Sequence, residues 1–318
     1  MDNKKKFLTR AYNKIVYNKK KFSVIKTSKE KRLLNEIYYL ENLPENKKIF
    51  FPQIINTKKN NRSHYSLELE FLPYNNLGLA MISSKFNKKY WTDTALAINN
   101  IIKNFQEKKK KANYVNDQIQ MFIKKTETEY FHFKKSKKKF QEICNLDKIH
   151  FNNNIFDNFE SIWPRIKKKI IKNNINPYLS FIHGDFCFSN ILTERNNLGI
   201  SIKLIDPRGK FGTYFNKGDI YYDLAKIRHS LNGGYEYLIY DKFTLNKLKN
   251  MYIFKFHNDN NKKILKIFDK YIFSKYDYNK IKLIEGTIFI GMCARHYDNS
   301  KRQLAMYLTG LKILNEIK

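Results

Sequence analysis

Cysteine, glycine and proline are scarce in this chain of 318 residues, which has only three, 11 and six of them respectively. The three cysteines, Cys144, Cys187 and Cys293, are far apart and lack the paired spacing of a zinc site. An odd number of scattered cysteines also argues against a disulfide framework. We therefore expect a reduced, cytoplasmic protein and exclude a small module held together by disulfides or zinc.

Long apolar segments are also missing. No run approaches the roughly 18 uninterrupted apolar residues that a membrane-spanning helix needs. The charged start, Met1 to Lys6, leads into no apolar stretch of a signal peptide. Hydrophobic residues nevertheless make up 42% of the chain, with 25 Phe and 22 Tyr, which is enough for a substantial core. The sequence predicts a globular protein without a membrane span.

Acidic residues are few, and the formal net charge is +32. Such a charge is typical of proteins that bind nucleic acid or another polyanion. AT-rich coding offers another explanation, because the chain is also rich in Asn, Ile, Tyr and Phe. No zinc-finger, helix-turn-helix or RNA-binding aromatic pattern accompanies the charge. We therefore regard nucleic acid as the less favoured partner, with lysine clusters at 108–111 and 134–139 as its candidate surface.

The first ninety residues predict short strands around one helix. Alternation predicts a strand over Lys21–Thr27, with Phe22 and Lys26 on the same face. Apolar residues at helical spacing predict a helix over 29–41. A second alternation predicts a strand over 65–71.

From Trp91 onward the pattern becomes mainly helical. Asp93 is the expected N-cap of a helix over Thr94–Lys111. The lysine-rich stretch 107–140 is expected on the surface, and the chain beyond Asp219 is expected to be mostly helical. A small strand-rich lobe followed by a large helical lobe is the simplest arrangement.

The clearest chemical signal lies between residues 181 and 206. His183, Asp185 and Asn190 have the order H-x-D-x-x-x-x-N, and Asp206 follows sixteen residues after Asn190. Phosphoryl transfer needs a carboxylate to accept the proton of the attacking hydroxyl and oxygen ligands to hold Mg²⁺ against the phosphates. Asp185 fits the first role, while Asn190 and Asp206 fit the second. His183 is expected to brace the loop by hydrogen bonds.

These motifs resemble the catalytic loop and metal-binding aspartate of the aminoglycoside phosphotransferase and choline kinase superfamily, relatives of the protein kinases. Gly184 replaces the arginine of the protein-kinase H-R-D motif, which favours a small-molecule kinase. The resemblance implies an α+β, bilobal, protein-kinase-like fold, with a small antiparallel-sheet N-lobe over 1–73 and a large, mainly helical C-lobe over 74–318. It also implies ATP and Mg²⁺ as cofactors and a small hydroxylated molecule as acceptor.

The resemblance extends to the nucleotide side. Lys26 matches the strand lysine that contacts the α- and β-phosphates, and Glu36 matches its helical partner, with Glu30 as the competing choice. Glu70 and Leu72 fall in the segment that resembles the hinge between the lobes, where backbone groups would bind adenine.

One departure concerns the glycine-rich loop, which should precede Lys26. Residues 1–25 contain no glycine, so Thr9, Arg10, Asn13 or backbone amides would have to contact phosphate instead. This absence keeps a nucleotide-binding module without turnover open as an alternative function, although Asp185, Asn190 and Asp206 are all present.

The run from Gly218 to Lys226 resembles the family's G-D-x-x-x-D-L-A stretch, in which an aspartate near a helix start supports the catalytic loop. Asp219 is the expected N-cap and Asp223 lies one turn further on.

Acceptor contacts are expected from basic and hydrogen-bonding residues of the helical lobe. The candidates are Arg208, Arg228, His229, Arg295 and His296. Because most are basic, they favour a neutral or anionic polyol, such as a sugar or a sugar phosphate, over choline or an aminoglycoside. The Asp206–Gly209 and Arg228–Ser230 segments resemble superfamily branches linked to cell-surface polysaccharide biosynthesis.

Overall fold

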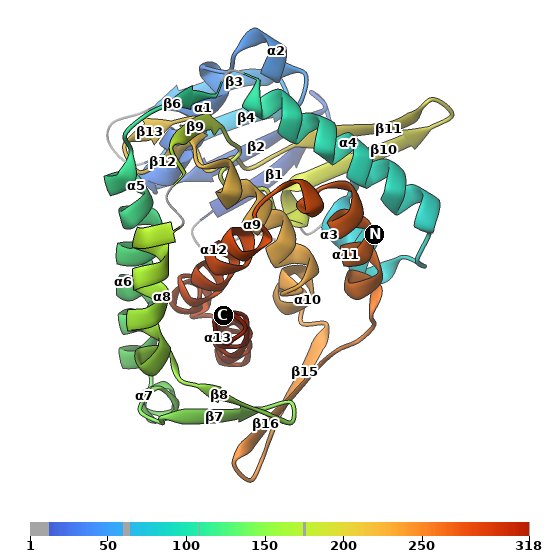
Figure 1. Cartoon of the computed structure of the whole chain (residues 1–318). Coiled ribbons are helices and arrows are strands. Elements are labelled where there is room, and N and C mark those ends of the chain that lie inside the picture. Colours follow the sequence, from blue (N-terminus) through green and yellow to red (C-terminus); the bar gives the residue numbers. More distant parts are fainter. Residues whose placement is uncertain (1–12, 60–63, 108, 174–175, 318) are drawn as a thin grey trace.

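The computed structural model describes residues 13–59, 64–107, 109–173 and 176–317. None of the helices within these ranges is both long and apolar enough to cross a bilayer. An antiparallel sheet lies at one end of the molecule, helices fill the middle, and a second sheet of four strands lies at the opposite end (Figure 1).

The N-terminal sheet has the strand order β1-β2-β4-β3, and every neighbouring pair is antiparallel. Its strands are β1 (Asn13–Asn18), β2 (Ser23–Ser28), β3 (Ile54–Lys59) and β4 (Tyr65–Glu70). Helix α1 (Lys31–Glu41) contacts β3 and β4 and buries Leu33, Ile37 and Leu40. The apolar stripe read from the sequence therefore forms the contact between this helix and the sheet, and a short helix, α2 (Glu45–Lys48), follows.

The prediction for the first strand needs one correction. Phe22 does not share a face with Lys26, because it lies in the turn before β2 with a φ of 47° and is 69% exposed. Turn geometry, with Asn18 Oδ1 accepting from the amides of Lys20 and Lys21, overrides the alternation at this position.

Small sheets surround the start of the helical part. β5 (Asn75–Asn76) pairs with the hairpin of β10 (Ile191–Asn196) and β11 (Gly199–Leu204). A second small sheet has the order β14-β9-β6. Its strands are β6 (Lys110–Lys111), β9 (Tyr178–Phe181) and β14 (Lys217–Gly218), and a separate pair is formed by β12 (Lys210–Phe211) and β13 (Tyr214–Phe215).

The C-terminal part is mainly helical. The first group comprises α3 (Leu77–Ser83), α4 (Lys88–Gln106), α5 (Val115–Ile119), the π-helix η1 (Gln120–Lys124), α6 (Lys125–Ser136), α7 (Lys138–Cys144) and α8 (Phe159–Asn173). The second group comprises α9 (Ile220–Leu231), α10 (Tyr235–Ile239), α11 (Asn260–Tyr271), α12 (Tyr278–Ile290), α13 (Ser300–Asn315) and three short 3₁₀ turns, η2 (Phe188–Asn190), η3 (Phe273–Lys275) and η4 (Cys293–His296). Helix α9 is almost wholly buried and packs against α12, which packs against α13. These three helices form the buried core of the helical part.

Two expectations for this part were wrong, and a third was confirmed. Asn87 caps α4 by accepting from the Tyr90 amide, so Asp93 lies inside the helix. The 107–140 stretch is not simply a surface segment, because Phe122 and Phe133 are buried. Beyond Asp219 the chain is mostly helical, as predicted. It also contains one hairpin, β15 (Phe243–Leu248) and β16 (Met251–Phe256), which joins β7 (Lys148–Phe151) and β8 (Asn154–Asp157) in the distal sheet.

Candidate active site

His183, Asp185, Asn190 and Asp206 lie next to one end of the hairpin formed by β10 and β11. His183, Asp185 and Asn190 lie between β9 and β10, and Asp206 follows β11. Ile191 of β10 pairs with Leu204 of β11, and the amide of the next residue, Ile205, donates to the Asn190 carbonyl at 3.0 Å. This register brings Asn190 and Asp206 to the same end of the hairpin although sixteen residues separate them in sequence.

His183 connects the 183–190 loop to the segment that carries Asp206. Its Nδ1 accepts from the Asp185 amide at 3.2 Å, and its Nε2 lies 3.1 Å from the carbonyl oxygen of Ile205. This pair of partners assigns the proton to Nε2. Complete burial lowers the pKa of His183 to about 4, against the opposing effect of Asp185 and Asp206, so the ring is neutral at pH 7.

Asp223 supports the same loop from helix α9. Its two carboxylate oxygens accept from the amides of His183 and Gly184 at 2.7 and 2.8 Å. Asp219 caps the helix, as the sequence predicted, by accepting from the Tyr221 amide at 3.0 Å. The buried start of α9 therefore holds the backbone of the 183–190 loop.

Two glycines allow close approaches around the loop. Gly184 has a φ of +76°, and a Cβ there would lie 2.8 Å from Cβ of Arg208. Gly209 has a φ of +82°, and a Cβ there would lie 2.4 Å from the carbonyl oxygen of Asn35 in α1. Both positions need a residue without a side chain.

Asp185 is 9% exposed and has two cationic neighbours. Lys226 of α9 places its Nζ 2.8 Å from Oδ1, and Arg32 of α1 places a guanidinium nitrogen 3.6 Å from Oδ2. The sequence interpretation assigned neither residue to the site. Helical spacing contained the signal, because Lys226 is three residues after Asp223 and Arg32 is four residues before Glu36.

Lys26, Glu36 and Asp206 form one ionic group. Lys26 Nζ lies 2.5 Å from a carboxylate oxygen of Glu36 and 2.5 Å from one of Asp206, so the lysine joins β2, α1 and the segment after β11. Burial alone would lower the pKa of Lys26, but the two carboxylates outweigh it and raise the pKa. Burial would likewise raise the pKa of Asp206, but Lys26 and Arg32 lower it to about 2. Asp206 also has a positive φ of 57°, an uncommon backbone geometry for a residue other than glycine.

The segment predicted as the hinge lies between the N-terminal sheet and β5. Glu70 is the last residue of β4, and its Oε1 accepts from the Gln53 amide at 3.0 Å. The following amide, of Phe71, donates to the Phe22 carbonyl at 2.8 Å. Leu72 comes next, in the irregular connection to β5. Of the residues suggested to replace the glycine-rich loop, Thr9 and Arg10 lie outside the described residues, and Asn13 begins β1.

The predicted acceptor residues divide into two groups. Arg208 and Arg295 line a cavity beside Asp185. Arg228, His229 and His296 are buried and are not among its lining residues.

Buried partners account for the positions of two residues in the second group. Arg228 forms an ion pair with Glu285 and stacks over Tyr278 at 4.9 Å. The His229 ring packs against the rings of Tyr235 and Phe289. Arginine and histidine this deep in the helical core contribute to packing and charge pairing, a role that the sequence pattern alone could not distinguish from acceptor binding.

The cavity opens between Asp185 and the helical part. Its walls come from the start of α1, the segment after β11, η1, α6, α9, α12 and η4. Cationic side chains dominate the lining, namely Arg32, Lys125, Arg208, Lys226 and Arg295. Lys125 and Lys226 were not predicted as contacts of the acceptor.

Known proteins resemble the chain in structure rather than in sequence. No protein-family model matches it, and neither does any curated protein sequence. The gentamicin complex of APH(2″)-IIa is 15% identical to this chain and has a TM-score of 0.50. The match covers 96% of this chain and 89% of the APH(2″)-IIa chain. The streptomycin–ATP ternary complex of APH(2″)-IIa is 14% identical and has a TM-score of 0.51. This match covers 93% of this chain and 88% of the other. A choline kinase from Cryptosporidium parvum has 12% identity and a TM-score of 0.47 over 96% and 87%.

The fold class is therefore α+β and protein-kinase-like, with an antiparallel sheet followed by a helical part. Within that class, the likeness over nearly the whole chain gives it the fold of the aminoglycoside phosphotransferases. The predicted α+β, protein-kinase-like fold is confirmed.

Proposed function

We propose that the protein is an ATP- and Mg²⁺-dependent phosphotransferase that phosphorylates a hydroxyl group of a small metabolite, a sugar or a sugar derivative. The contact of Lys26 with both Glu36 and Asp206 carries the proposal. It joins three elements distant in sequence in the arrangement that positions phosphates and metal in kinases.

Asp185 is the proposed general base. Its carboxylate lies in the cavity next to two cations, which favour the charged form that can accept a proton. Phosphoryl transfer requires the protein mainly to position groups and to stabilise charge. Asp185 would orient the acceptor hydroxyl and accept its proton as the bond between the acceptor oxygen and phosphorus forms. Arg32, close to Asp185, is also placed to stabilise negative charge on the transferred group.

Asn190 and Asp206 are the proposed ligands of Mg²⁺. Their side chains offer an amide oxygen and a carboxylate, the oxygen donors that this ion prefers, and Mg²⁺ is usually held by one or two carboxylates plus substrate phosphates. The Asn190 amide nitrogen donates to the Asp185 carbonyl at 2.8 Å, which directs the side-chain oxygen elsewhere. When bound, the metal would neutralise charge on the phosphates.

The nucleotide would lie against the N-terminal sheet. Lys26 would exchange its contact with Asp206 for the α- and β-phosphates while Glu36 keeps it oriented. Backbone groups of the Glu70–Leu72 segment would bind adenine. A supply of ATP is consistent with the expected cytoplasmic location.

The test is mass spectrometry of a small-metabolite extract and a sugar panel, each incubated with Mg²⁺–ATP. Wild type is compared with Asp185→Asn and with a matched control, Asp147→Asn, which changes an exposed aspartate of the helical part. A phosphorylated product formed by wild type and the control, but reduced about 10²- to 10⁴-fold in Asp185→Asn, is expected. Folded wild type that forms neither product nor ADP would contradict the proposal and favour a nucleotide-binding module.

A further inference from the structure

The cavity beside Asp185 has an unusual charge balance. Among the described residues, five cationic side chains line it, against one carboxylate, that of Asp185. Glu129 lies just behind and pairs with Arg295, with nitrogen–oxygen distances of 2.7 and 2.8 Å. Two carboxylates therefore face five cations, and Asp185 itself is shared between Arg32 and Lys226.

Two of the five cations have no ion-pair partner in the described part of the chain. Arg208 donates only to uncharged acceptors, the Lys210 carbonyl, the Tyr222 hydroxyl and the Met121 sulfur. Lys125, on the first turn of α6, makes neither a hydrogen bond nor an ion pair there with its side chain. Burial lowers the pKa of Lys125 well below its usual range, and the charges of Arg208, Arg295 and Lys226 lower it further, against the opposing effect of Glu129. An anion among these groups would relieve their mutual repulsion.

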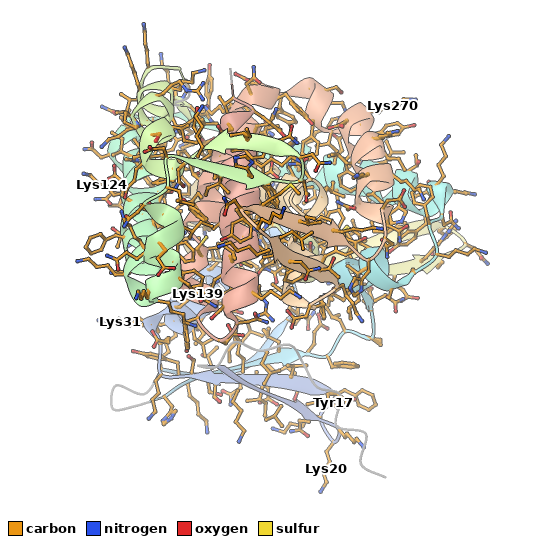
Figure 2. The ribbon with its side chains drawn as sticks, turned by 90° about the horizontal axis from the view of Figure 1, so that it is seen from below. Tyr17, Lys20, Lys31, Lys124, Lys139 and Lys270 are labelled. Carbon is orange, nitrogen blue, oxygen red and sulfur yellow. The ribbon has the colours of Figure 1, made fainter. Side chains whose placement is uncertain are left out.

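General lysine enrichment does not explain this cluster. Figure 2 shows labelled lysines on different sides of the molecule, Lys20, Lys124, Lys139 and Lys270 among them, as a composition bias would produce. Arginine is rare by contrast, with nine in the whole chain, yet Arg32, Arg208 and Arg295 all line this one cavity. Arg32 lies on α1, Arg208 lies in the segment after β11, and Arg295 lies in η4. The fold therefore brings three arginines that are distant in sequence into one cavity.

Three of the five cations lie apart from the nucleotide side, whereas Arg32 lies on α1 and Arg208 follows Asp206 by two residues. Lys125, Lys226 and Arg295 lie on α6, α9 and η4 of the helical part. Lys26 and Glu36, which would hold the nucleotide phosphates, lie on β2 and α1. Asp185 lies between the two groups, because it faces the cavity while the loop that carries it contacts the segment before Asp206.

We propose that the acceptor carries an anionic group, a phosphate or a carboxylate, which Lys125, Arg208 and Arg295 bind while its hydroxyl faces Asp185. This inference rests on the proposed phosphotransferase function and narrows its acceptor to anionic sugar derivatives. Arginine suits the task because its planar guanidinium binds carboxylate and phosphate through two hydrogen bonds. The same charges would repel aminoglycosides and choline.

The first experiment measures ADP release with four matched acceptors: glucose, glucosamine, glucose 6-phosphate and glucuronate. They share one ring and differ in charge, so the last two separate phosphate from carboxylate recognition. We expect kcat/KM for at least one anionic sugar to exceed that for glucose by about tenfold or more, with glucosamine lowest. Equal or better turnover of glucose or glucosamine would overturn the anionic acceptor and leave the phosphotransferase function standing.

The second experiment measures binding without turnover. Inorganic phosphate and glucose 6-phosphate are titrated calorimetrically into the full chain with saturating Mg²⁺–ADP, so that the nucleotide site is filled. Lys125→Met should weaken binding about 10- to 100-fold, the usual cost of one charge-assisted hydrogen bond, and Lys125→Arg should restore most of it. Lys124→Met is the matched control, because its side chain is 58% exposed and lies outside the cavity.

The outcomes of the two experiments are separable. Wild type that binds neither anion, or Lys125→Met that binds both as wild type does, overturns the inference whether or not the protein is a kinase. Anion binding that depends on Lys125, in a protein that releases no ADP with any acceptor, supports the anion site and contradicts the phosphotransferase function. Thermal unfolding of each variant identifies a loss that comes from misfolding.

Discussion

The two sides of Asp185 differ in how their charges are balanced. On the nucleotide side, Lys26 lies between Glu36 and Asp206, and each of these charges has an opposite partner. On the acceptor side, five cations converge with a single carboxylate in the cavity lining. The comparison suggests that the nucleotide side is assembled within the chain itself, whereas the acceptor side requires an anion from outside to complete it.

The largest expected effect is on the nucleotide side. Asp206→Ala should lower Mg²⁺-dependent ADP formation by about 10³-fold or more, because it removes the proposed carboxylate ligand of the metal. Initial rates over a range of Mg²⁺ concentrations provide the measurement, with Asp147→Ala as the exposed control. Full activity in Asp206→Ala would show that this carboxylate has no part in metal binding.

Lys26→Met should have the next largest effect and separate the two sides kinetically. We expect kcat/KM for ATP to fall about 10²-fold while the KM of the acceptor changes little, because Lys26 lies on the nucleotide side. Lys14→Met is the matched control, since Lys14 is exposed on the neighbouring strand opposite Thr27. The buried Glu36 would lose its partner, so the free energy of unfolding is measured in parallel and Lys26→Arg is included. A change confined to the KM of the acceptor would contradict this division.

The lowered pKa of His183 leads us to expect that the free energy of unfolding depends on pH. The native pKa of about 4 lies below the usual 6.5, so the unfolded chain binds the extra proton more readily. The neutral His183 ring therefore contributes its full stabilisation above about pH 6.5. As the pH falls toward 4 this stabilisation is lost, and the free energy of unfolding decreases by up to about 3 kcal/mol. Urea unfolding from pH 7 to 4.5 should show a steeper loss for wild type than for His183→Gln. Parallel slopes would mean that His183 takes up its proton over the same pH range in the native and the unfolded chain, which would contradict the lowered pKa.

The smallest effect is expected from lysines far from either side. Replacing Lys20, Lys139 and Lys270 together by glutamine should alter the free energy of unfolding by no more than about 0.5 kcal/mol per site and leave kcat/KM unchanged. Activity assays and thermal unfolding test this. A tenfold loss of activity would mean that the general positive charge takes part in function, which would weaken the contrast between cavity and surface.

The sequence was informative where residues with one role lie close together along the chain. Spacing predicted the loop of His183, Asp185 and Asn190, and its distance to Asp206 reflects a single hairpin. Alternation predicted β4, and the apolar stripe predicted α1. These patterns depend on local geometry, which the sequence records directly.

The acceptor cavity is different in origin. Lys125, Lys226 and Arg295 come from three helices whose packing depends on contacts across the whole helical core. In a chain with 61 lysines and arginines, nothing in the local sequence distinguished Lys125 from Lys124. The same limit explains why Arg228 and His229 were expected near the acceptor, since partners such as Glu285 are distant in sequence.

Gly209 links two parts of the proposed site through one close contact. The segment after Asp206 touches the Asn35 carbonyl of α1 with no space for even a methyl group. Helix α1 also carries Arg32 and Glu36, so a displacement of this helix would shift the neighbours of both the proposed base and the proposed metal ligand at once. A side chain at position 209 would therefore disturb the surroundings of the proposed base and of the proposed metal ligand together, although it lies in neither site.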